Sequence, residues 1–176
     1  MADGFRTDYV VQNKSDRVMP FSLGGHTGFR CPMREGERFE DYVVRFDEPE
    51  TGEVVCCLPG GLMRQTERAP LARGTELALD HATFDQKDTL IFAGLKSRGV
   101  SLVHRETGHG LRFAFPKFHT LAIWTMPGKN APYLCLEPWN GLPASAEGSN
   151  ALEDRPFVVK LDAKMSYQCA YEMRAC

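Results

Sequence analysis

A histidine set between glycines is the first residue of this chain whose setting suggests chemistry. His26 follows a short apolar strand and the pair Gly24–Gly25, and it precedes Gly28 and Phe29. Glycine allows backbone or a ligand to approach closely, so the histidine can lie in a concave site. Histidine changes charge near neutral pH and can therefore give or take a proton. The alternative is a tight turn that carries a histidine without a function.

A glutamate at the end of an apolar strand is the second candidate. Glu137 is followed by Pro138 and Trp139. Strand alternation places Tyr133, Cys135 and Glu137 on one face. Burial without a positive partner raises the pKa of a carboxyl group and makes it a better base near neutral pH. The alternative is an edge glutamate that forms an ion pair with a basic residue.

Three further residues have both a structural and a functional interpretation. Asp88 stands directly before the apolar run 89–92, where an aspartate commonly closes a turn through backbone N–H groups. Trp124 and Trp139 are ordinary core aromatics, or they are platforms for the apolar face of a sugar.

Composition indicates one globular domain over residues 1–176. Hydrophobic residues make up 43% and charged residues 25% of the chain. The net charge is −2 without a long run of either sign, which gives no reason to expect nucleic acid or an anionic membrane as partner. No apolar run is long enough for a membrane span, and the first residues lack a signal-peptide core, so we expect a cytoplasmic protein.

The cysteines and histidines give no metal motif. Six cysteines occur without a C-x-x-C pair, and five histidines occur without an H-x-H or H-E-x-x-H pattern. We expect the cysteines to be thiols, as in other proteins of a reducing compartment. The spacing does not support a metal site, and we expect no cofactor.

Short apolar runs between turn residues predict an all-β protein. Around ten strands without a sustained helical period indicate an antiparallel sandwich or barrel. The stretch 80–88 has room for one helical turn. The predicted strand pairs are 7–12 with 17–23, 39–46 with 53–58, 101–104 with 111–115, and 157–161 with 166–173.

Taken together, these segments resemble the aldose 1-epimerase (galactose mutarotase-like) superfamily, and specifically its LacX-like branch. The matching pieces occur in the family's order across nearly the whole chain. They are 20–29, 46–50, 87–92, 94–97, 123–128 and 135–139.

The resemblance implies an antiparallel β-sandwich with a sugar cleft on one sheet. In the family, the histidine that matches His26 is the general acid toward the ring oxygen, and the glutamate that matches Glu137 is the general base on the anomeric hydroxyl. Asp88, ahead of Asp85, matches an aspartate that binds sugar hydroxyls. This chemistry needs no metal or nucleotide. Phe29, Trp124 and Trp139 are the other residues that we expect to contact a hexose or a related aldose.

The chain resembles only the C-terminal part of the family. The N-terminal strands, which in the family bring an arginine and a second histidine to the sugar, have no counterpart here. The sequence is therefore a fragment, a naturally short member, or one piece of a split protein. Uncovered sheet edges would favour pairing with another chain, such as a homodimer. Three hypotheses follow: an anomer-interconverting isomerase, a carbohydrate-binding module without turnover, and an interaction domain.

Overall fold

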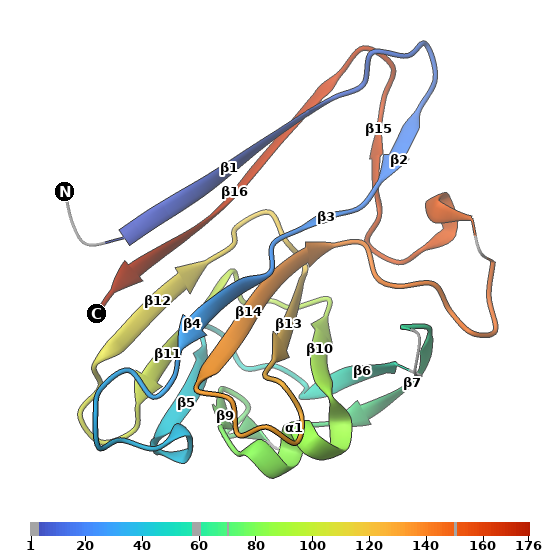
Figure 1. Ribbon diagram of the computed structural model, residues 1–176. Helices are drawn as coiled ribbons and strands as arrows, with labels where there is room; N and C mark the ends of the chain where they lie inside the picture. Colours follow the sequence, from blue (N-terminus) through green and yellow to red (C-terminus); the bar gives the residue numbers. More distant parts are fainter. Residues whose placement is uncertain (1–3, 58–60, 70, 150) are drawn as a thin grey trace.

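Antiparallel strands in two facing sheets form most of the molecule. The computed structural model describes residues 4–57, 61–69, 71–149 and 151–176 (Figure 1). The first sheet has the strand order β1 (Gly4–Gln12), β16 (Ser166–Ala175), β12 (Gly110–Ala114), β11 (Gly99–His104), β5 (Tyr42–Phe46), β9 (Glu76–Ala78) and β8 (Leu71–Ala72). The second has the order β3 (Leu23–Gly24), β14 (Tyr133–Asn140), β13 (Thr120–Trp124), β10 (Thr89–Ala93), β6 (Glu53–Cys57) and β7 (Met63–Arg68). The predicted antiparallel β-sandwich is thus confirmed.

Smaller elements complete the fold. Strand β4 (Thr27–Arg30) also pairs with β14, and β2 (Met19–Phe21) pairs with β15 (Val159–Leu161) in a separate ribbon. The helical elements are α1 (His81–Lys87) and the 3-10 turns η1 (Phe39–Asp41) and η2 (Leu152–Asp154).

Alternating side chains of the two sheets build the core between them. On β14, Leu134 and Leu136 point into this core and are fully buried. Phe113 of β12 meets Phe29 of β4 across the core, with ring centroids 5.6 Å apart. Since β14 gives one face to the core, its other face, with Glu137, lies on the outer side of the second sheet.

The strands near the two ends of the chain pair differently from the prediction. Strand β1 pairs along its length with β16, not with the strand that follows it, and β2 pairs with β15 (Figure 1). The buried Asn13 explains the change, because its amide donates to the carbonyl oxygens of Arg17, Leu161 and Asp162. These bonds direct the chain after β1 toward β15 instead of back along β1. The predicted hairpins 7–12/17–23 and 157–161/166–173 are therefore wrong.

The predicted hairpin of 39–46 with 53–58 is also wrong. Strand β5 pairs with β11 and β9, whereas β6 pairs with β10 and β7 in the other sheet. Val44 and Val54 both bury their side chains in the core between the sheets, so the turn between them carries the chain from one sheet to the other.

The remaining local predictions are confirmed. Strands β11 and β12 form the expected hairpin. Asp80 is the N-cap of the short helix α1, and its side chain accepts a hydrogen bond from the N–H of Ala82 at 3.1 Å. Asp88 is the C-cap of the same helix. No helix within the described residues has the length and apolar character needed to cross a membrane. The expected homodimer stays a prediction.

Replacing the core residue Phe113 with alanine should destabilise the protein strongly. Its ring is fully buried and contacts Phe29, Phe115 and Tyr171. We expect Phe113→Ala to lower the free energy of unfolding by about 3–5 kcal/mol in urea titrations. The control Val10→Ala changes a side chain that is 60% exposed and should cost less than about 1 kcal/mol. Equal losses in both variants would contradict this core assignment.

Candidate functional site

The pairing of β3 and β4 with β14 determines where His26 lies. Gly24 is opposite Trp139 on one side of His26, and Gly28 is opposite Cys135 on the other. Both segments keep the same register, so His26 falls opposite Glu137. Residues directly opposite in an antiparallel pair project from the same face. The two side chains are therefore neighbours in space, although more than a hundred residues lie between them in the sequence.

His26 and Glu137 are in direct contact. His26 Nδ1 lies 2.5 Å from Glu137 Oε1. The histidine side chain is 63% exposed, whereas the glutamate side chain is only 8% exposed. The pair thus consists of a buried carboxyl group and a solvent-facing imidazole. Because Nδ1 faces the carboxyl group, Nε2 is the ring nitrogen on the outward edge.

Burial raises the pKa of Glu137 above the usual value of a glutamate. The nearby charge of His26 and the hydrogen bonds from His26 and Trp139 act in the opposite direction without cancelling the effect of burial. A carboxyl group in this setting is a stronger base than an exposed one. The site therefore holds a buried carboxyl group of raised pKa in contact with an exposed imidazole.

Trp124 and Asp88 extend the same face away from Glu137. Trp124 is opposite Cys135, and its ring centroid lies 5.8 Å from that of His26. Its Nε1 donates a hydrogen bond to Asp88 Oδ1 at 3.0 Å. Asp88 is exposed and has a φ of 58°, a conformation that is uncommon outside glycine. Asp85, the second candidate, instead accepts a hydrogen bond from the N–H of Gly128 at 2.6 Å.

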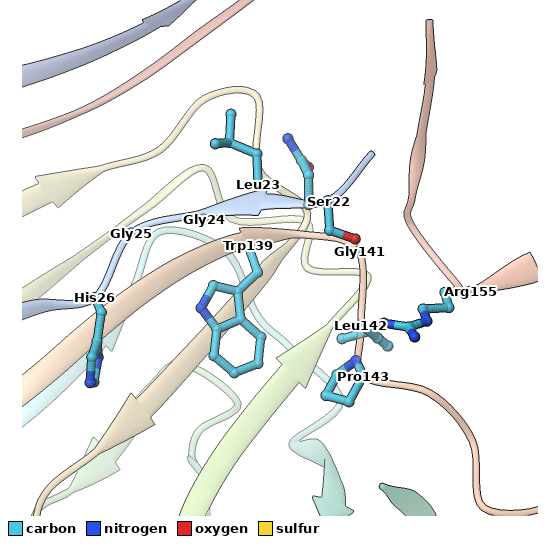
Figure 2. Close-up of a pocket in the computed structure, with 11 residues that line it drawn as sticks. Ser22, Leu23, Gly24, Gly25, His26, Trp139, Gly141, Leu142, Pro143 and Arg155 are labelled. Carbon is cyan, nitrogen blue, oxygen red and sulfur yellow. The ribbon is translucent and has the colours of Figure 1, made fainter. Parts of the chain in front are cut away.

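The predicted aromatic residues divide between the site and the core. Trp139 lies on the same strand face as Glu137 and lines a pocket of about 420 Å³ together with His26 (Figure 2). Phe29 is opposite Leu134, is buried, and packs against Phe113 in the core. The structure does not bring Phe29 to the other site residues, and we leave it out of the proposed site.

The structure also brings to the site residues that the sequence analysis did not assign to it. Ser22, Gly141–Pro143 and Arg155 line the pocket with His26 and Trp139. They come from segments that meet only because β3 pairs with the end of β14 and the chain then returns through η2 (Figure 2). The sequence of a loop does not show which distant segments it contacts in the fold.

One group of donor atoms is compact enough for a metal ion. Among the described residues, it consists of His26, Cys135 and Glu137, whose nitrogen, sulfur and oxygen atoms lie within 4.8 Å of one another. Burial raises the pKa of the Cys135 thiol to about 11, so this sulfur is protonated at neutral pH. A metal would have to displace this proton and open the contact between His26 and Glu137. The sequence gives no sign of the group because His26 is remote from the other two.

The raised pKa of Glu137 makes a prediction about stability and pH. The folded protein binds the proton of this group more tightly than the unfolded chain does. Its contribution to the free energy of unfolding therefore falls as the pH rises from the unfolded-state pKa to the folded-state pKa. Glutamine does not titrate. Hence the stability of Glu137→Gln relative to wild type should increase between about pH 4 and about pH 6, below the range where an ordinary histidine loses its proton.

Urea unfolding at the two pH values measures this difference. Cys169→Ala is the control, because burial raises the pKa of this thiol on β16, so it is neutral at both pH values and its removal should shift stability equally. A constant or decreasing difference for Glu137→Gln would contradict the raised pKa.

Comparison with known proteins gives the same family as the residues of the site. Residues 2–148 match the Aldose 1-epimerase family. The plasmid-encoded and chromosomal LacX proteins of Lactococcus lactis subsp. lactis are each 40% identical over 159 residues. These residues cover 89% of this chain and 52% of each relative, so the chain spans about half the length of the curated relatives that it matches.

Solved structures resemble the fold over nearly the whole chain. A galactose mutarotase related enzyme from Lactobacillus acidophilus has a TM-score of 0.85 and 25% identity, covering 98% of this chain and 57% of that one. A galactose mutarotase-like protein from Lactobacillus casei has a TM-score of 0.83 and 25% identity, covering 97% and 58%. From its sequence match and its fold, the chain belongs to the aldose 1-epimerase family.

Proposed function

We propose that this protein interconverts the anomers of an aldose, with His26 as general acid and Glu137 as general base. The observation that carries the proposal is the direct contact of these two groups on the outer face of the second sheet. The anomeric hydroxyl and the ring oxygen of a pyranose are bonded to the same carbon. An acid and a base that serve these two oxygens must therefore be close neighbours, as His26 and Glu137 are.

The reaction follows from the two protonation states. Glu137 as carboxylate takes the proton of the C1 hydroxyl, while protonated His26 gives a proton to the ring oxygen. The bond between C1 and the ring oxygen breaks, and a carbonyl group forms at C1. Rotation about the C1–C2 bond turns the other face of the carbonyl toward the C5 hydroxyl, which attacks C1. His26 recovers a proton from the attacking hydroxyl, and Glu137 returns its proton to the anomeric oxygen.

The surrounding side chains suit the binding of a sugar. The indole of Trp139 offers an apolar surface beside His26 for the C–H groups of a pyranose. Asp88 and Trp124 are linked by a hydrogen bond, and the exposed carboxylate has acceptor capacity left for sugar hydroxyls. The sugar would insert between His26 and Glu137 and separate them, since catalytic hydrogen bonds tighten only around the substrate.

Sugar binding without turnover is the second candidate function. The observation that favours it is the 63% exposure of the His26 side chain. An imidazole open to water exchanges its proton with solvent and is held less firmly toward a substrate than a buried one. The two candidates differ only in whether the reaction is accelerated.

Glu137→Gln separates the two candidates. Glutamine keeps the shape of the side chain and most of its hydrogen bonding but does not accept the proton. If Glu137 is the base, the rate of anomer interconversion should fall by about 10²–10⁴-fold while sugar binding survives. The rate is followed by polarimetry or NMR exchange of freshly dissolved α-glucose and α-galactose, and binding by calorimetry.

The matched control is Glu106→Gln, an exposed glutamate in the turn between β11 and β12, which should leave the rate unchanged. His26→Gln should lose activity to a similar extent as Glu137→Gln. Equal, substantial catalysis by wild type and Glu137→Gln would refute the role of the base. Sugar binding by a wild type that does not accelerate the exchange would make the binding module the better description.

A further inference from the structure

The pocket that holds His26 continues toward an arginine. From His26 the lining follows β3 and the end of β14 to Gly141–Pro143 and Arg155. In Figure 2 the indole of Trp139 lies between His26 and Arg155. A ligand that stacks on Trp139 with one end at His26 would thus extend toward Arg155. The volume of about 420 Å³ is in the range of small-molecule sites.

Arg155 has no anionic partner within the described part of the chain. None of the ion pairs among these residues includes Arg155, although Glu153 and Asp154 precede it directly. Its Nε is buried and has no hydrogen-bond acceptor among the described residues. A buried donor without a partner costs free energy, more so when it is charged. A ligand that placed acceptor oxygens against the guanidinium would supply the anionic partner that Arg155 lacks.

The backbone holds Arg155 at the pocket. Its N–H donates to the carbonyl oxygen of Leu152 at 3.2 Å, which closes η2. The carbonyl oxygen of the next residue, Pro156, accepts a hydrogen bond from the N–H of Leu142 at 3.0 Å. These bonds connect the segment that carries Arg155 to the end of β14. The arginine is therefore part of the pocket wall.

The charge and polarity of the lining also favour an anion. The lining itself contains no carboxylate, and its ionisable side chains are His26 and Arg155. The carboxyl group of Glu137 contacts His26 and so lies at the opposite end of the pocket from Arg155. Ser22 adds a hydroxyl group, which lies against Gly141; a Cβ at Gly141 would be 2.3 Å from Ser22 Oγ. Guanidinium and hydroxyl groups are the usual donors to phosphate and carboxylate oxygens.

We propose that Arg155 forms a subsite for an anionic substituent, a phosphate or a carboxylate, on the sugar bound at His26. The inference rests on the proposed function in so far as the pocket takes a sugar. The sugar ring lies on Trp139, with its anomeric carbon at His26 and Glu137 and its anionic group at the guanidinium. Substrates of this class are sugar phosphates or sugar acids, and neutral aldoses bind more weakly.

Calorimetric titration with three related sugars tests the subsite. The probes are glucose, glucose 6-phosphate and glucuronate, which differ in the group at C6. We expect wild type to bind at least one of the anionic sugars about 10- to 100-fold more tightly than glucose, since hydrogen bonds to charged groups are the strong ones. A preference for glucose 6-phosphate assigns the subsite to phosphate, and a preference for glucuronate assigns it to carboxylate.

Arg155→Met should remove this preference by weakening the binding of the anionic sugars about 10- to 100-fold more than the binding of glucose, while Arg155→Lys should restore part of it. The matched control Arg105→Met changes an exposed arginine in the β11–β12 turn and should bind all three sugars as wild type does. Thermal unfolding shows whether Arg155→Met is folded; if it is not, Arg155→Lys and the loss of preference with added salt provide the test.

Equal affinity of wild type for all three sugars, no binding of either anionic sugar, or an unchanged preference in folded Arg155→Met would each overturn the subsite. Failure of the proposed function has a different signature. If the Arg155-dependent preference is present but no sugar is interconverted, the subsite stands and the acid–base roles of His26 and Glu137 do not.

Discussion

The antiparallel pairing of β4 with β14 is the constraint on which the candidate site depends. Its register puts His26, just before β4, opposite Glu137, and it puts Phe29 of β4 opposite Leu134 in the core. A slip of one residue would exchange these faces and would turn the aromatic ring outward. The burial of Phe29 therefore fixes the position of His26. A residue of the core, Phe29, thus determines where His26 of the candidate site lies.

Glycines beside the histidine let this pairing carry bulky groups on its outer face. A Cβ at Gly24 would be 2.5 Å from Trp139 Cδ1, so the indole lies where a side chain would otherwise stand. The position opposite Cys135 is Gly28, where a Cβ would be 3.6 Å from the sulfur. Gly25 is also required by a close approach, because a Cβ there would be 2.6 Å from Tyr171 Cε1, whereas Gly28 is not. Gly24 is the glycine that faces Trp139. It is the residue that allows an aromatic surface next to His26.

The sequence predicts those parts of the site that depend on local pattern. Alternation along β14 correctly separates Cys135 and Glu137 from Leu134, because strand periodicity is a property of the segment itself. The resemblance then links His26 to Glu137. Phe29 is three residues from His26, so the same alternation places the two side chains on opposite faces, and the assignment of Phe29 to the sugar does not follow this pattern. Arg155 is missed for a different reason, since the fold of η2 brings it to the pocket.

Long-range pairing is also where the sequence reading of the fold fails. Each of the end strands has a clear strand pattern, yet adjacent strands in the chain are not partners. The buried amide of Asn13 selects the actual partners by bonding the carbonyl groups of Leu161 and Asp162 at the end of β15 and that of Arg17 before β2. Without these bonds, three carbonyl oxygens and the amide of Asn13 would need hydrogen bonds to water in a turn where Asn13 is buried. A single polar side chain therefore directs the pairing of four strands, and the same ribbon leads the chain from β2 into the strand that carries Gly24.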